Sequence, residues 1–184
     1  PESCLFPGSE IERWQMMRAI QFIRNSSEAG AAVDVELPLP VAGGHDLLVK
    51  IEAIAMNPVD YKVRPAEGAD PKTLGFDAAG AVVGVGDEVT LFAEGDEVYF
   101  AGDVTRPGTN AEYQLVDERI VAKRPATLDA VRSAALPLTT LTAWESLFDR
   151  LGIDFENANG NAGKSLLIIG GAGGVGSMAI QLAK

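Results

Sequence analysis

Residues 165–184 read SLLIIGGAGGVGSMAIQLAK, in which four consecutive large apolar residues run into a glycine cluster. The segment from Ser177 onward favours a helix, so the order predicts a β-strand over 166–169, a tight turn and a helix. Gly171, Gly173 and Gly176 have the spacing of the G-x-G-x-x-G pattern. Glycines in that pattern permit an unusual turn, let the backbone approach a pyrophosphate and let the helix pack close to the strand.

The glycine cluster therefore predicts a site for the phosphates of a dinucleotide, which would face the N–H groups and the positive dipole end of the helix. A turn that is rich in glycine for steric reasons alone is the alternative, but the apolar run before it and the helical segment after it favour the cofactor interpretation. The acidic residue that usually confirms the pattern is expected about 20 positions further on, a position that these 184 residues do not include. The predicted binding residues are Gly170, Gly171, Ala172, Gly173, Gly174, Val175 and Gly176.

Composition narrows the class of protein. With 184 residues and 47% hydrophobic content, the chain can form one domain and part of another. Its formal net charge of -11, without a Lys/Arg cluster, argues against nucleic acid or an anionic membrane as the main partner, and we interpret the acidic balance as an aid to solubility. A single cysteine, Cys4, excludes a disulfide framework, and the chain has neither a membrane-length apolar run nor a signal-peptide layout, so we expect a cytoplasmic protein.

Short strands separated by turn residues fill the first two thirds of the chain, after an expected N-terminal extension. We expect strands over 18–22 and 33–37 as a pair, 47–55 as the longest, 75–86 with closely approaching backbones, 95–100 and 110–116. They predict a closed or partly closed β-barrel from Met17 to Val121. Its expected core residues are Ile51, Ile54, Val82, Val83, Val98 and Leu115.

Helical patterns follow. A short helical piece is expected from Pro58, a short helix over 128–136 and a longer one over 139–151. The longer one carries an apolar stripe that we interpret as core rather than a ligand surface: Leu141, Trp144, Leu147, Phe148 and Leu151. Residues 154–163, rich in Asn and Gly, should form a surface loop.

Four motifs in this order resemble a known family. They are NPVD at 57–60, the small-residue block at 75–86 continuing to 98, AALPLTTLTAW at 134–144 and the glycine cluster at 170–176. The chain resembles the medium-chain dehydrogenase/reductase superfamily on its quinone-oxidoreductase side, and especially the group of zinc-type alcohol dehydrogenase-like proteins.

The resemblance implies a fold that passes from α+β to α/β. After the extension at 1–16, a GroES-like β-barrel domain would cover 17–136. This domain would hold the substrate, which is expected to be a small molecule. Residues 137–184 would begin a Rossmann NAD(P)-binding domain and supply only its first β-α unit. The domain is thus expected to be truncated, and the whole protein is expected to be a homodimer.

Zinc-dependent members of the family have Cys at the position of Asn57, His and Glu at Phe76 and Asp77, and a further Cys near Leu138. A catalytic zinc needs three ligands drawn from Cys, His and carboxylates. Only Asp77 qualifies here, and we expect it to bond to nearby backbone instead. The single histidine, His45, is expected at the surface, so no metal is predicted.

Without a Lewis acid, hydride transfer from NADPH or NADH to an activated acceptor such as a quinone or an α,β-unsaturated carbonyl is still possible. By resemblance, the catalytic residues are Asn57, Asp60 and Tyr61, and Thr142 lies near the nicotinamide. Capping of a helix N-terminus is an equal alternative for Asp60. The family often has its tyrosine one position later, where this chain has Lys62.

Two other functions stay open: a non-catalytic protein that retains the reductase fold, and a zinc-dependent alcohol dehydrogenase. We expect these 184 residues to be inactive alone, because they supply only part of a cofactor pocket. We also expect 165–184 to be disordered, aggregation-prone or covered by another chain, since the apolar strand has no partner strand here.

Overall fold

The structure is a computed structural model that describes residues 16–24, 30–66 and 68–184. The longest strand, β3 (Asp46–Ala55), belongs to a five-stranded antiparallel sheet with the order β7-β3-β5-β6-β8. The other strands of this sheet are β5 (Asp77–Val85), β6 (Glu97–Ala101), β7 (Tyr113–Asp117) and β8 (Val121–Lys123). The expected N-terminal extension and Cys4 lie outside the described residues, apart from Met16, which opens the first strand.

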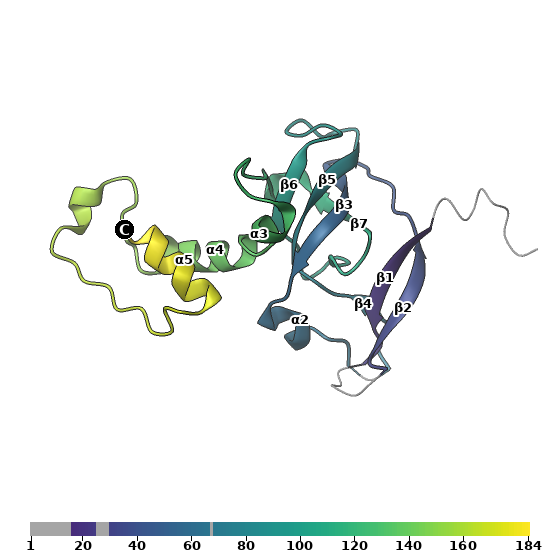
Figure 1. Cartoon of the computed structure of the whole chain (residues 1–184), viewed down its shortest axis with the longest axis horizontal. Coiled ribbons are helices and arrows are strands. Elements are labelled where there is room, and N and C mark those ends of the chain that lie inside the picture. Colours follow the sequence, from purple (N-terminus) through teal and green to yellow (C-terminus); the bar gives the residue numbers. More distant parts are fainter. Residues whose placement is uncertain (1–15, 25–29, 67) are drawn as a thin grey trace, which may run out of the picture.

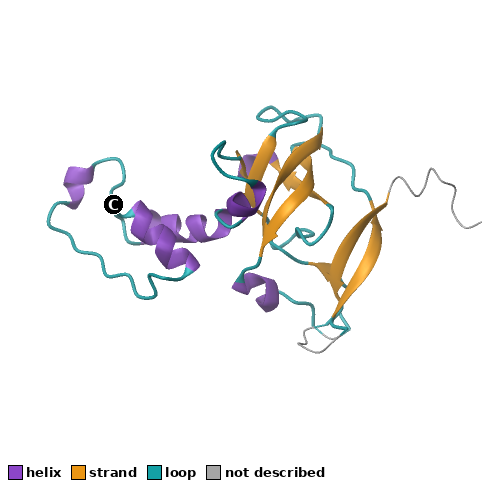
Figure 2. Cartoon of the chain, in the orientation of Figure 1, coloured by secondary structure: helices purple, strands orange, loops and turns teal. Residues whose placement is uncertain are grey.

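A second sheet has the order β2-β1-β4 and contains β1 (Met16–Phe22), β2 (Ala32–Pro38) and β4 (Lys72–Thr73). The predicted pairing of the first two strands is confirmed, with Met16 opposite Pro38 and Phe22 opposite Ala32. The five-stranded sheet lies between this sheet on one side and helices α4 and α5 on the other (Figures 1 and 2). Helices α4 and α5 therefore lie at the end of the molecule opposite β1 and β2 (Figure 1).

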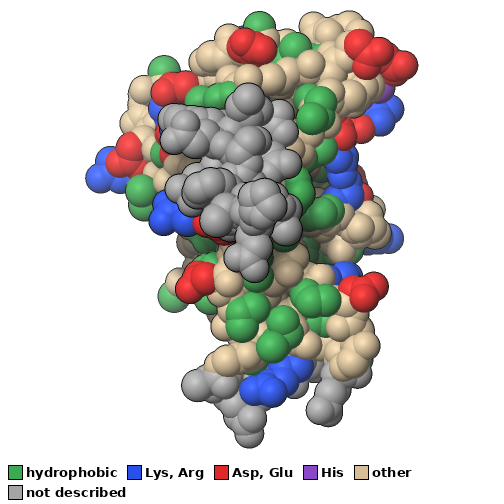
Figure 3. Space-filling view, turned by 90° about the vertical axis from the view of Figure 1, so that its right-hand side faces the viewer, with side chains coloured by type: hydrophobic (Ala, Val, Ile, Leu, Met, Phe, Trp, Pro, Cys, Tyr) green, Lys and Arg blue, Asp and Glu red, His purple; other side chains and the backbone are tan. Residues whose placement is uncertain are grey.

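Of the closed or partly closed barrel that was expected, full closure is absent among the described strands. The strands form two open sheets, and the edge strands β7 and β8 of the larger sheet do not pair with each other. An isolated bridge between Ala19 and Ala111 connects the sheets, beside a salt bridge of 2.7 Å between Arg18 and Glu112. The side of the molecule formed by β1 and β2 carries acidic and basic side chains interspersed with hydrophobic ones (Figure 3).

The core of the larger sheet consists of Leu47, Val49, Ala78, Val82, Val98, Phe100 and Val116. Of the expected core residues, Val82 and Val98 are confirmed and Ile51 packs against the cluster. Ile54 and Val83 are instead 44% and 41% exposed. Leu115 is half-buried and lines a cavity of about 300 Å³ between β7 and the smaller sheet.

Glycine explains how closely β3 and β5 approach. A Cβ added at Gly80 would lie 2.1 Å from the Lys50 carbonyl oxygen, so a side chain cannot fit there. The close backbone approach expected in the 75–86 block is therefore confirmed.

The helices are α2 (Pro58–Lys62), α3 (Ala130–Ala134), α4 (Pro137–Trp144) and α5 (Gly174–Leu182), with 3-10 turns η1 (Glu118–Ile120) and η3 (Ala158–Asn161). A π-helical turn, η2 (Glu145–Arg150), continues α4, so the long helix expected over 139–151 is present. Among the described residues, no helix combines the length and apolar character that a membrane crossing requires.

A small second core joins α4, η2 and α5 through Ala143, Leu147 and Ala179. Trp144 and Phe148 add to this region, with ring centroids 4.5 Å apart. The apolar stripe is thus core only in part, since Leu141 and Leu151 are 52% and 63% exposed.

The strand expected over 166–169 is wrong as well. These residues pair with no strand in the described chain and belong to an open loop between η3 and α5 at the end farthest from β1 and β2 (Figure 1). Leu167 and Ile169 are 85% and 90% exposed, while Ile168 packs against the α4–α5 core. The helix after the glycines is present and begins at Gly174 rather than at Ser177.

Candidate functional site

Asp77, the first residue of β5, is fully buried and joins three segments of the chain. Its Oδ2 accepts a hydrogen bond of 2.8 Å from the side-chain amide of Asn57. Its Oδ1 accepts one of 2.8 Å from the backbone N–H of Leu138, in the first turn of α4. The backbone hydrogen bond expected of Asp77 is therefore present, and it reaches a residue far away in the sequence.

Burial raises the pKa of Asp77 to about 6, because the charged carboxylate loses its hydration inside the protein. The hydrogen bonds from Asn57 and Leu138 lower this pKa, and the charge of Asp60 raises it. Burial also raises the pKa of Asp60, against the opposing effect of the N–H groups of Asn57 and Gly75. Two interacting carboxyl groups thus lie at this corner of the fold, where β3 ends and α2 begins.

Asn57 and Asp60 are joined through the start of α2. The N–H of Asn57 donates to Oδ2 of Asp60 at 2.6 Å, and the N–H of Asp60 donates to the carbonyl of Asn57 at 3.0 Å. Pro58 occupies the first turn, where the missing N–H costs nothing. This is the capping arrangement that was the alternative for Asp60, so its carboxylate has a structural role.

The two remaining predicted residues, Tyr61 and Thr142, make no contact with Asp77 that the structure records. Tyr61 lies on α2 and is 55% exposed. Thr142 is exposed on α4, and its hydroxyl donates to the carbonyl of Leu138 at 2.7 Å. The structure thus brings Asn57, Asp60 and Asp77 together, with Tyr61 on the same short helix as Asp60.

The glycine turn shows where side chains are excluded. Gly170 has a φ of +74°, and the N–H of Gly173 donates to its carbonyl at 2.9 Å. A Cβ added at Gly176 would lie 2.4 Å from that same carbonyl oxygen, and one at Gly173 would lie 3.3 Å from it. The turn therefore keeps its backbone bare at the N-terminus of α5, which is the condition for close approach of a phosphate.

The start of α5 packs directly on the start of α4. A Cβ added at Gly174 would lie 3.0 Å from Cγ2 of Thr139, the residue that follows Leu138. Thr139, which contacts the glycine turn at Gly174, is therefore the direct neighbour of Leu138, whose N–H donates to Asp77.

The residues present do not fit a catalytic zinc. Neither Phe76 nor Leu138 has a ligating side chain, and the amide nitrogen of Asn57 donates to Asp77. Phe76 is buried. Within 16–24, 30–66 and 68–184, no three His, Cys, Asp or Glu residues are grouped so that they could hold a metal ion.

A cavity of about 730 Å³ lies between β6, β8 and the start of α4, lined in part by Phe100, Leu136 and Leu141. None of the predicted site residues lines it. No local sequence pattern marks this cavity, because it forms between segments that are distant in the chain.

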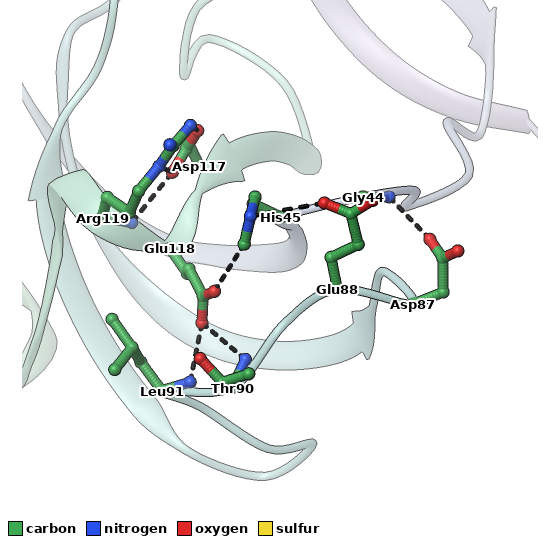
Figure 4. Close-up of polar contacts among 9 residues, drawn as sticks. All are labelled: Gly44, His45, Asp87, Glu88, Thr90, Leu91, Asp117, Glu118 and Arg119. Carbon is green, nitrogen blue, oxygen red and sulfur yellow. Dashed lines mark hydrogen bonds and ion pairs between the residues drawn. The ribbon is translucent and has the colours of Figure 1, made fainter.

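His45 was expected to be a plain surface residue, but it belongs to a polar cluster (Figure 4). Its Nδ1 lies 2.8 Å from Oε1 of Glu118, whose side chain is only 2% exposed, and its Nε2 lies 3.3 Å from Glu88. Oε2 of Glu118 accepts from the N–H groups of Thr90 and Leu91 at 2.9 and 2.7 Å. Although burial would raise the pKa of Glu118, these hydrogen bonds outweigh it and the pKa is lowered.

Residues 43–126 match the family model of the alcohol dehydrogenase GroES-like domain. The chain is 48% identical over 172 residues to a zinc-type alcohol dehydrogenase-like protein of Staphylococcus epidermidis, an alignment that covers 91% of this chain and 51% of the relative. It is 35% identical over 179 residues to the chloroplastic quinone-oxidoreductase QR1 of Triphysaria versicolor, covering 92% of this chain and 53% of the relative.

A similar solved structure is that of a putative zinc-dependent alcohol dehydrogenase protein from Rhizobium etli CFN 42. It is 52% identical with a TM-score of 0.83, over 92% of this chain and 50% of the other. The chain thus spans about half the length of the curated relatives that it matches.

Proposed function

The chain belongs to the medium-chain dehydrogenase/reductase superfamily, with zinc-type alcohol dehydrogenase-like and quinone-oxidoreductase-like relatives, and from this premise we propose a function for the complete protein. It is a zinc-independent, NAD(P)H-dependent oxidoreductase that reduces quinones or α,β-unsaturated carbonyls. The observation that carries the proposal is the replacement of the zinc-ligand positions by Asn57, Phe76 and Leu138, with Asp77 engaged by hydrogen bonds.

NADPH or NADH supplies the hydride when it is bound, and acceptors of this class need no Lewis acid to receive it. The bare backbone of 170–176 and the N-terminus of α5 would hold the pyrophosphate. Thr142 would lie near the nicotinamide. Asn57 and Asp60 would line the substrate cleft while keeping the hydrogen bonds described above, and the exposed phenol of Tyr61 is the candidate proton donor to the substrate oxygen.

A non-catalytic protein with the reductase fold is the second candidate. The observation that favours it is the use of Asn57 and Asp60 in hydrogen bonds that stabilise the fold. The consumption of NADPH with a small quinone, measured with the complete protein, separates the two. Turnover supports the oxidoreductase, whereas intact cofactor binding without turnover supports the second candidate.

The cofactor site has its own test in the complete protein. Gly173→Val places a branched side chain on the backbone that must approach the pyrophosphate, so binding of NADPH should be lost or greatly weakened while the sheets stay folded. Fluorescence titration of NADPH measures the affinity and circular dichroism the fold. Unchanged affinity in the variant would mean that the glycine cluster is a packing turn.

A further inference from the structure

Asp77 connects the residues proposed for the substrate to the helices proposed for the cofactor. We propose that Asp77 is a positioning residue, which fixes the helix pair α4–α5 and its glycine turn relative to Asn57 during hydride transfer. The inference rests on the proposed function and adds a role for a residue that need not touch substrate or cofactor.

On the side of the proposed substrate site, a single hydrogen bond connects Asp77 to Asn57. Asn57 ends the turn between β3 and α2, and its side-chain amide donates to Oδ2 of Asp77 at 2.8 Å. The N–H of Asn57 is held by Asp60 at 2.6 Å. Asn57 is therefore fixed from its backbone by Asp60 and from its side chain by Asp77.

On the side of the proposed cofactor site, one hydrogen bond and one packing contact connect Asp77 to the glycine turn. Oδ1 of Asp77 holds the N–H of Leu138 at 2.8 Å, and Thr139 packs on Gly174 at the first turn of α5. The buried residues Ala143, Leu147 and Ala179 join the two helices along their length. Because the two helices pack against each other, fixing the first turn of α4 should also fix the glycine turn.

A carboxylate suits this place because it offers two acceptor oxygens and no donor, and both of its partners are donors. Its neighbours across the sheet are Ala55 on β3 and Ala101 on β6, which have no polar side-chain group to replace it. An asparagine has one acceptor oxygen, so Asp77→Asn keeps the shape but turns an NH₂ group toward one of the two donors. That variant breaks one of the two connections without opening a cavity.

The test compares Asp77→Asn with two controls in the complete protein. Asp87→Asn changes a surface carboxylate that likewise accepts one backbone N–H, from Gly44 at 2.8 Å. Val98→Ala removes buried volume from β6 and lowers stability without touching Asp77, Asn57 or Leu138. For each variant, kcat and KM for a small quinone, the Kd of NADPH and the thermal midpoint are measured at a temperature where all are folded.

For Asp77→Asn, we expect kcat/KM for the quinone to fall by about ten- to a hundredfold, as misplacement by about 1 Å can produce. The Kd of NADPH should stay within about twofold, because the glycine turn keeps its own contacts. Both controls should keep wild-type kcat/KM, even though Val98→Ala lowers the thermal midpoint.

Two results would overturn the inference while leaving the proposed function intact. One is wild-type kcat/KM in Asp77→Asn, and the other is a loss of kcat/KM that Val98→Ala reproduces at equal loss of stability. Wild-type protein that shows no turnover would instead contradict the proposed function, and the inference with it.

Discussion

At the scale of single residues, the buried carboxyl of Asp77 should be visible in the pH dependence of stability. Its pKa is raised from 3.8 to about 6 in the folded chain, so the folded state binds the proton more tightly than the unfolded state does. The stabilisation is fully present below pH 3.8 and is lost as the pH rises through about 6. The loss amounts to about 3 kcal/mol, at about 1.4 kcal/mol per pH unit.

Asp77→Asn cannot titrate, so its free energy of unfolding should lack this decline between pH 4 and 6.5. Urea denaturation of both proteins at several pH values measures the difference. Parallel curves for the two proteins would mean that the Asp77 pKa is ordinary.

Glu118 should show the opposite sign. Its pKa is lowered from the ordinary 4.5, so its contribution to stability is present above pH 4.5 and is lost as the pH falls below it. Glu118→Ala leaves the N–H groups of Thr90 and Leu91 without their acceptor and should lower the thermal midpoint at pH 7. Glu118→Gln keeps an acceptor oxygen, so it should lose less, and equal losses in the two variants would contradict this role.

At the scale of elements, the pairing of β3 with β5 depends on Gly80. A Cβ there would lie 2.1 Å from the Lys50 carbonyl oxygen, so Gly80→Ala must separate the strands and should cost more than about 3 kcal/mol. Gly84, on the same strand, is the matched control, since its Cβ would lie 3.6 Å from Cβ of Leu48 in ordinary contact. Gly84→Ala should change stability by less than about 1 kcal/mol. Similar losses in both variants by chemical denaturation would contradict the close approach at Gly80.

The positions of these strands were predictable because alternating apolar residues and turn signals are local, but the buried faces were not. Leu48 pairs with Gly84 and Val49 with Val82, so Val83 is an extra residue at a bulge and turns outward. A second shift between Ile51 and Ala53 precedes the exposed Ile54. In β7 the buried residues are Gln114 and Val116 rather than Leu115, and the amide of Gln114 donates to the Pro107 carbonyl at 2.9 Å. Bulges and long-range hydrogen bonds leave no local pattern in the sequence.

The candidate site was predictable to a similar extent. The glycine turn and the start of α2 follow from local motifs, since Gly and Pro set backbone conformation directly. The bond between Asp77 and Leu138 spans 61 residues and could be found only in the fold. The strand over 166–169 was predicted from an apolar run followed by a glycine turn and a helix, but a strand also needs a partner with which to pair.

At the scale of the whole molecule, the loop that contains Leu167 and Ile169 should make the 184-residue chain self-associate. These side chains are 85% and 90% exposed, and burying each would gain about 1.5–3 kcal/mol. The double variant Leu167→Ser with Ile169→Ser should therefore shift the chain toward monomer in sedimentation velocity.

The matched control replaces Val41 and Val131, which are 87% and 72% exposed on other segments, by serine. This control should associate as the wild-type chain does. A wild-type chain that stays monomeric over the whole concentration range would contradict the prediction.

The central claim is that hydride transfer in the complete protein needs no zinc, because the ligand positions hold Asn57, Phe76 and Leu138. The most direct measurement is the rate of NADPH consumption with a small quinone before and after dialysis against a chelator, with the zinc content determined on the same samples. We expect turnover at the same rate in both samples, with far less than about one zinc per chain. Turnover that disappears with the metal and returns with about one zinc per chain would contradict it.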